Sequence, residues 1–203
     1  RLIYPDGRVQ HAGIVHGYYD GMAGPALKLL PSWHHGYLSY AMVTRNCSAV
    51  TAACMLTRRS LFLEHGGFNE RQFAVAYNDV DYCYRLMDQG LRCVYAPGAE
   101  LYHHEGLSRG FGDNPEELAA FRRKYSGRTD PYYNPNLSLL NEQFEISPRR
   151  LVRHPSKRPI RALMCSCNLN LEGAAYSQYE LTLELARAKQ IDAVVYSPVD
   201  GPL

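Results

Sequence analysis

Acidic and imidazole side chains gather in one short stretch of the chain, between residues 66 and 110. Asp79 and Asp81 stand two positions apart in the run Asn-Asp-Val-Asp, and the pair His103 and His104 follows downstream. An aspartate can take a proton from a hydroxyl group, and an imidazole can bind a divalent cation such as manganese. These residue types therefore indicate proton transfer, metal binding or both.

A short helix is predicted to carry the two aspartates. Asn78 is a good N-cap, Asp81 stands where a capping-box acid would lie, and apolar residues recur at helical spacing over 79–89 until Gly90 ends the helix. The positive end of a helix favours carboxylates, so we expect Asp79 to be ionised at neutral pH. The structural alternative is that both acids only complete the cap.

Two short strands are predicted to carry the histidines. Residues 91–95 and 99–102 are rich in β-forming residues and are separated by an Ala-Pro-Gly turn. His103 and His104 then emerge at the end of the second strand. The structural alternative is a pair of histidines that caps a strand end.

Other segments frame this stretch. We predict a hairpin over residues 1–15 with its turn at Asp6-Gly7, an aperiodic loop at 17–40, a long strand at 42–56 and a helix at 58–65 that Gly66-Gly67 ends. In the loop, Trp-His-His at 33–35 could stack on a sugar, although such residues more often plug a loop onto a domain.

Downstream, Asn114-Pro115 predicts the start of a helix over 115–125. The Arg-Arg-Lys run at 122–124 is interpreted as a solvated face. The Pro-punctuated segment 130–137 is expected to wrap over the surface of the domain.

Several ordered motifs in residues 1–144 resemble the catalytic half of family 2 glycosyltransferases, most closely the bacterial cell-surface polysaccharide type. They are Tyr-Pro-Asp-Gly-Arg-Val-Gln-His-Ala-Gly at 4–13, Gly-Gly-Phe-Asn-Glu at 66–70, Asn-Asp-Val-Asp at 78–81, His-His-Glu-x-x-Ser-Arg-Gly at 103–110 and Asp-Pro-Tyr-Tyr-Asn-Pro-Asn-Leu at 130–137. Their order along the chain makes the resemblance more specific than any single motif.

The resemblance implies an α/β fold, the C-terminal half of a GT-A nucleotide-diphospho-sugar transferase. In that family the metal-binding Asp-x-Asp and the nucleotide pocket precede the point where Arg1 stands. The sequence has no initiator Met and opens in a predicted strand. We therefore expect a piece of a longer protein, inactive alone, with a strand ending in Asp-x-Asp upstream.

Residue roles also follow from the resemblance. Asp79 matches the family's catalytic base, with Asn78 in place of the usual Glu, and His103 matches a ligand of a divalent cation, Mn or Mg, whose other ligands lie outside this fragment. The residues implied to contact substrate are Thr51 and Ala52 on the floor of the site, Asn78 and Asp81 beside the base, and Ser108 and Arg109 on a lid.

The implied reaction moves a sugar from a nucleotide-diphosphate sugar to a saccharide or lipid-linked acceptor, with inversion, in cell-surface polysaccharide synthesis. Such an enzyme is a hexosyltransferase-like member of class EC 2.4. It needs a base for the acceptor hydroxyl and a counter-charge for the departing diphosphate. Two alternatives stay open: a noncatalytic module that binds a sugar or a partner, and a metal-dependent phosphohydrolase.

Two domains joined by a linker are expected: a GT-A domain at 1–145, a basic Pro-containing linker at 146–159 and a partial Rossmann-like unit at 160–203. Within the last, strand, helix and strand are predicted at 160–167, 176–189 and 191–197, which makes a βαβ unit. Residues 167–174 and 197–203 resemble the opening of a family 4 glycosyltransferase of the GT-B type. A surface for anionic lipid is the alternative interpretation of the linker.

Composition excludes some classes of protein. A formal net charge of +2 over 203 residues, with no base-reading module, argues against nucleic acid as a partner. The six cysteines include no Cys-x-x-Cys pair, which favours reduced thiols in a cytoplasmic protein. We expect neither a signal peptide nor a membrane span, and the lipid interpretation of the linker would place the protein peripherally at the inner face of the membrane.

Overall fold

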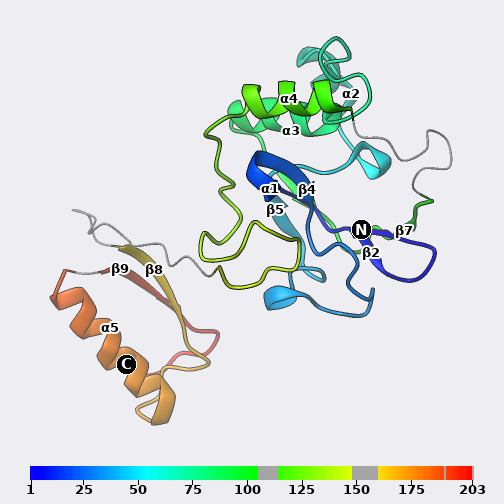
Figure 1. The fold of residues 1–203 in the computed structure, drawn as a ribbon. Helices are drawn as coiled ribbons and strands as arrows, with labels where there is room; N and C mark the ends of the chain where they lie inside the picture. Colours follow the sequence, from blue (N-terminus) through cyan, green and yellow to red (C-terminus); the bar gives the residue numbers. More distant parts are fainter. Residues whose placement is uncertain (105–113, 148–159, 190, 203) are drawn as a thin grey trace. The chain divides into compact units, whose positions relative to one another are not determined.

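A computed structural model gives the fold (Figure 1). It describes residues 1–104, 114–147, 160–189 and 191–202. The chain divides into two compact units, Arg1–Arg150 and Leu151–Leu203. Both combine helices with small sheets, which agrees with the predicted α/β class. Most of the predicted linker 146–159 lies outside the described residues.

Three small sheets form the strand layer of unit 1. The strands are β1 (Leu2–Ile3), β2 (Val9–His11), β3 (Ile14–Gly17), β4 (Met22–Pro25), β5 (Arg45–Cys47), β6 (Cys93–Tyr95) and β7 (Leu101–Tyr102). The predicted hairpin is confirmed, because β1 pairs antiparallel with β2. On its other edge β1 pairs in parallel with β7, and β3–β4 and β5–β6 are antiparallel pairs. The sheets thus join the start of the chain to the segment that precedes His103.

The long strand predicted at 42–56 is wrong in its extent. Only β5 is a strand, because its partner β6 offers just three positions for pairing. The Thr51 side chain then accepts a hydrogen bond from the Ala53 amide at 3.3 Å and starts the 3-10 turn η2 (Ala52–Cys54). A run of small and β-branched residues forms a strand only where another strand can pair with it.

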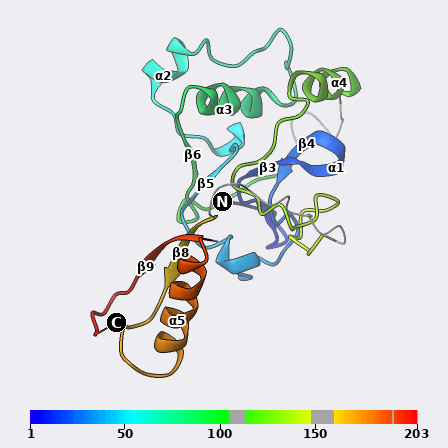
Figure 2. The same ribbon diagram turned by 90° about the vertical axis from the view of Figure 1, so that its left-hand side faces the viewer.

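Helices lie together on one side of these sheets (Figures 1 and 2). They are α2 (Arg59–Glu64), α3 (Asn78–Asp88) and α4 (Pro115–Lys124), while α1 (Tyr18–Gly21) and the 3-10 element η1 (Tyr37–Ser39) are single turns. The three helices predicted at 58–65, 79–89 and 115–125 are confirmed to within one residue at each end. Asn114 caps α4 as expected, with its side chain accepting from the amides of Glu116 and Glu117.

The start of α3 differs from the prediction. The N-cap is Tyr77, with a left-handed φ of 63°, and Asn78 is the first helical residue. The Asp81 amide donates to the Tyr77 carbonyl oxygen, so Asp81 is not a capping-box acid. The Tyr77 ring stacks on Phe121 of α4, with centroids 4.4 Å apart. This stacking holds Tyr77 in a backbone conformation that costs a non-glycine residue energy.

The core of unit 1 includes the segment that was predicted to wrap its surface. Tyr133 and Leu137 are buried with Phe144 in a cluster around Tyr18. The Asp130 carboxylate accepts a hydrogen bond from the His16 amide at 2.8 Å. Residues 130–137 therefore close one end of the unit instead of covering it loosely.

Unit 2 is the predicted βαβ unit. β8 (Ile160–Cys165) and β9 (Ile191–Tyr196) pair in parallel, and α5 (Gly173–Arg187) connects them and packs on one face of the pair (Figures 1 and 2). The side chains of Leu163 and Val194 stay 65% and 64% exposed. Among the helices that the structure describes, none is long and apolar enough to cross a membrane.

Candidate active site

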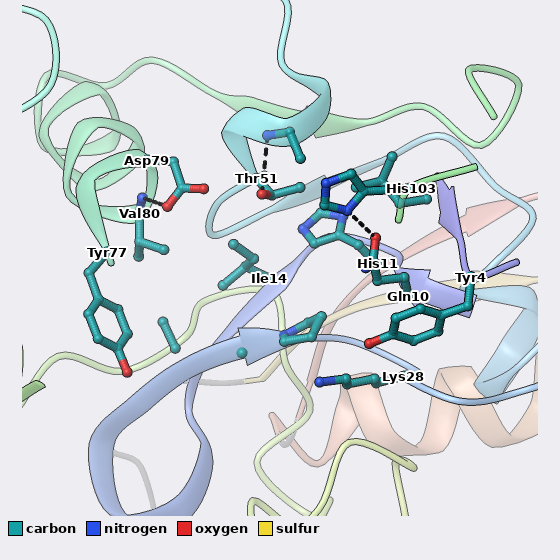
Figure 3. Close-up of a pocket in the computed structure, with 15 residues that line it drawn as sticks. Tyr4, Gln10, His11, Ile14, Lys28, Thr51, Tyr77, Asp79, Val80 and His103 are labelled. Atoms are coloured by element: carbon teal, nitrogen blue, oxygen red, sulfur yellow. Dashed lines mark hydrogen bonds between the residues drawn. The ribbon is translucent and has the colours of Figure 1, made fainter. Parts of the chain in front are cut away.

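A cavity of about 310 Å³ in unit 1 brings together residues from distant parts of the sequence (Figure 3). Its walls come from β1 and β2, from β4 and the loop after it, from η2, from the start of α3 and from the end of β7. Asp79 and His103 both line it, and so does Thr51. The aspartate and the imidazole that the motifs single out therefore face a common cavity.

Asp79 is held in place by backbone amides on two elements. One carboxylate oxygen, Oδ2, accepts from the Ala52 amide at 2.8 Å, and the other, Oδ1, accepts from the Val80 amide at 2.8 Å. A carboxylate oxygen can accept more than one hydrogen bond, so each keeps capacity for a ligand. The side chain is half-buried, and its orientation is set before any ligand arrives.

Ala52 thus contributes through its backbone. Its amide binds Asp79, while the residue itself lines a neighbouring cavity of about 890 Å³. His11 belongs to the lining of both cavities. The predicted floor thus contributes to both cavities, since Thr51 lines the first and Ala52 lines the second.

The imidazole of His103 is oriented by contact with a neighbouring side chain. Its Nδ1 lies 2.8 Å from Oε1 of Gln10, which is buried in β2. An amide oxygen accepts hydrogen bonds, so this contact suits an imidazole that carries a proton on Nδ1. This pattern is typical of a histidine that ligates a metal through Nε2 while a second residue orients its ring.

One imidazole does not make a metal site. Across the described parts of the chain, no group of three or more His, Cys, Asp or Glu side chains could hold a metal ion. The chemistry of His103 fits the predicted ligand role, and the further ligands would have to come from outside the described residues. His104, next in the sequence, is exposed.

Asp81 is not part of the cavity. Its side chain is fully buried, and its carboxylate accepts from Lys124 Nζ at 2.5 Å, from the Tyr125 hydroxyl at 2.7 Å and from Arg85 Nε at 2.9 Å. Burial alone would raise the pKa of this carboxyl, but the three hydrogen bonds outweigh it and the pKa is lowered. Asp81 was predicted to contact substrate. In the structure its carboxylate is enclosed by protein side chains and joins α3 to α4.

Of the remaining predicted residues, the structure describes Asn78 and Lys124. Asn78 is half-buried at the first position of α3 but is not among the lining residues. Ser108 and Arg109 lie outside the described residues. Lys124, which was predicted to belong to a solvated basic face, instead pairs with Asp81.

Two cavity residues, His11 and Lys28, were not singled out from the sequence. His11 is only 8% exposed, and its Nδ1 accepts from the Gly13 amide at 3.3 Å. Its Nε2 is buried with no hydrogen-bond partner among the described residues. Burial lowers the pKa of His11 to about 3, so the ring is neutral. His11 falls within the motif at 4–13, whereas Lys28 lies in an aperiodic loop that offered no signal.

Curated proteins resemble this chain over part of its length. An uncharacterized protein of Sinorhizobium fredii, y4gI, is 45% identical over 74% of this chain and 17% of its own length. The O-antigen biosynthesis protein RfbC of Myxococcus xanthus is 42% identical over 68% of this chain and 11% of its own length. An N-acetylglucosaminyl-diphospho-decaprenol L-rhamnosyltransferase of Mycobacterium tuberculosis is 34% identical over 60% of this chain and 39% of its own length.

The names of the second and third relatives support a glycosyltransferase family and a role in polysaccharide synthesis. The chain spans between 11% and 39% of the length of these relatives. No family model and no solved structure matches it. The resemblance of residues 160–203 to family 4 glycosyltransferases finds no support among these relatives and stays a prediction.

Proposed function

We propose that unit 1 is the acceptor-side half of an inverting, metal-dependent glycosyltransferase of the GT-A type, acting in cell-surface polysaccharide synthesis. The observation that supports this most is the shared cavity, which Asp79 lines from α3 and His103 from the end of β7. The donor would be a nucleotide-diphosphate sugar. The acceptor would be a saccharide on a lipid diphosphate, the class named for the mycobacterial relative.

Asp79 would act as the general base. It takes the proton of the acceptor hydroxyl while that oxygen attacks the anomeric carbon of the donor, and the bond from this carbon to the diphosphate breaks on the opposite side. Asp79 needs no reorientation, because the Ala52 and Val80 amides already fix its carboxylate. Such preorganisation reduces the cost of reaching the reactive geometry.

A divalent cation, Mn or Mg, would bind Nε2 of His103, with its remaining ligands supplied from outside the described residues. When bound, it would neutralise charge that develops on the departing diphosphate. Gln10 would serve this arrangement by accepting from Nδ1 and orienting the ring, so that Nε2 is the nitrogen offered to the metal. Action at the inner face of the membrane, where lipid-linked acceptors would be available, is part of the same proposal.

Asp79→Asn in the full-length protein tests the proposal. Loss of a general base should lower the rate of sugar transfer by about 10²- to 10⁴-fold. Asp88→Asn is a matched control, because Asp88 lies at the other end of the same helix and its exposed side chain pairs with Arg128. Transfer is measured with radiolabelled donor sugar, and circular dichroism checks that both variants fold.

The rival functions give different results. If Asp79→Asn transfers sugar as fast as Asp88→Asn, the catalytic assignment is wrong. A noncatalytic module would bind saccharide equally well in both variants and transfer none. A metal-dependent phosphohydrolase would cleave the nucleotide sugar at the same rate whether or not an acceptor is present.

A further inference from the structure

Lys28 stands in the wall of the cavity without a counter-ion. It is half-buried and lies in the loop after β4. Among the described residues, no ion pair or hydrogen bond engages its ammonium group. Asp79 is the acidic residue in the described lining, and in Figure 3 it lies at the upper left of the view, with Lys28 below the centre.

The backbone around Lys28 is rigidly held. Its own carbonyl oxygen accepts from Gln143 Nε2 at 3.0 Å. The Leu27 amide donates to the Glu142 carbonyl oxygen at 3.0 Å, and the Leu29 amide donates to that of Val9 at 2.8 Å. The surrounding segments therefore fix the loop on both sides of the lysine.

The same loop is strained. Leu27 and Leu29, the residues on either side of Lys28, have left-handed φ angles of 59° and 70°. A bulky side chain at positive φ is uncommon and costs energy of order 1–3 kcal/mol. Leu27 is fully buried, so its packing in the buried cluster around Tyr18 helps hold this conformation. The result places a flexible cationic side chain at the cavity wall, where partial burial costs hydration.

We propose that Lys28 binds a phosphate of the substrate's diphosphate group. This inference rests on the proposed transfer reaction. In an inverting displacement the leaving group lies on the far side of the reacting carbon from the attacking oxygen. A cation that lines the same cavity apart from the base is therefore suited to the diphosphate of the nucleotide sugar. The diphosphate of a lipid-linked acceptor has the same chemistry and is the other source.

Lys28→Met in the full-length protein tests this inference. Arg123→Met is the matched control, because it also removes one positive charge and Arg123 is exposed on α4, away from the lining. Loss of one charge-assisted hydrogen bond should weaken inhibition of transfer by inorganic pyrophosphate about 10- to 100-fold. The control should keep wild-type inhibition, and circular dichroism confirms folding of both.

Two further inhibitors identify the source of the phosphate. If Lys28 serves the donor, Lys28→Met weakens inhibition by a nucleoside diphosphate and leaves that by a short polyprenyl diphosphate unchanged. If it serves the acceptor, the pattern reverses. Equal inhibition of Lys28→Met and Arg123→Met by all three compounds overturns the role of Lys28. Because that result leaves the loss of transfer in Asp79→Asn intact, it is distinguishable from failure of the proposed function.

Discussion

The first turn of α3 carries two aspartates in opposite surroundings. Asp79 is half-buried, accepts hydrogen bonds from two backbone amides and lines the cavity, whereas Asp81 is fully buried and bound by Lys124, Tyr125 and Arg85. Two positions along a helix turn a side chain by about 200°, so one acid faces the cavity and the other faces α4. This difference shows that two acids of one motif can serve different purposes: one lines the cavity, and the other holds two helices together.

The largest expected effect is a difference in the free energy of unfolding between the two variants in which one of these aspartates is replaced by Asn. Asp81→Asn leaves two partly exposed cations, Arg85 and Lys124, without their buried anion, which should cost about 3 kcal/mol and lower the melting temperature by about 10 °C. Asp79→Asn should stay within about 1 kcal/mol of the wild type, because it loses only amide contacts at a half-exposed position. Urea unfolding followed by circular dichroism measures both, and similar losses in the two variants would contradict the comparison.

The difference in the free energy of unfolding between the wild type and Asp81→Asn should become smaller at acid pH. The native pKa of Asp81 is lowered, so the unfolded chain, whose Asp pKa is about 3.9, takes up this proton first as the pH falls. The stabilisation by Asp81 is thus complete well above pH 4 and is lost as the pH drops through the native pKa. Urea unfolding at a series of pH values from about 7 to 3 checks this, and a constant gap would refute it.

Lys124→Met should destabilise the protein less than Asp81→Asn. Lys124 is one of three groups on Asp81, and its side chain is 32% exposed, so the pair is partly screened by solvent. The loss should be about 1 kcal/mol, because Arg85 and Tyr125 still hold the carboxylate. Arg123→Met, one residue away and exposed, should change stability by less than about 0.5 kcal/mol. Thermal melts of the two variants side by side make the measurement.

Local signals predicted much of the fold. Asn114-Pro115 marked the start of α4, Gly66-Gly67 marked the end of α2, and Asp6-Gly7 marked the first hairpin turn. In each case the side chain or the backbone freedom of the residue itself sets the local structure. The βαβ order of unit 2 was likewise visible, since its apolar and helical periods alternate along the chain.

Errors arose where a distant segment decides the outcome. Asn78 was predicted as the cap, but stacking on Phe121 holds Tyr77 in that position. Asp81 was predicted to complete the helix cap or to contact substrate, and Lys124 to lie on a solvated face; only the packing of α4 on α3 shows that they meet. Lys28 reaches the cavity through a loop without periodicity, so no pattern in the sequence could mark it.

Pairing of β7 with β1 completes the cavity at a late stage of synthesis. During synthesis, His11 and then α3 with Asp79 leave the ribosome before β7, the strand that pairs in parallel with Leu2 and Ile3. Closing such a long loop costs entropy that shorter hairpins do not lose. A nascent chain halted before residue 101 would hold Asp79 but could not bring His103 to Gln10. The order of translation therefore delays the joining of the cavity walls that carry Asp79 and His103 until most of unit 1 has emerged.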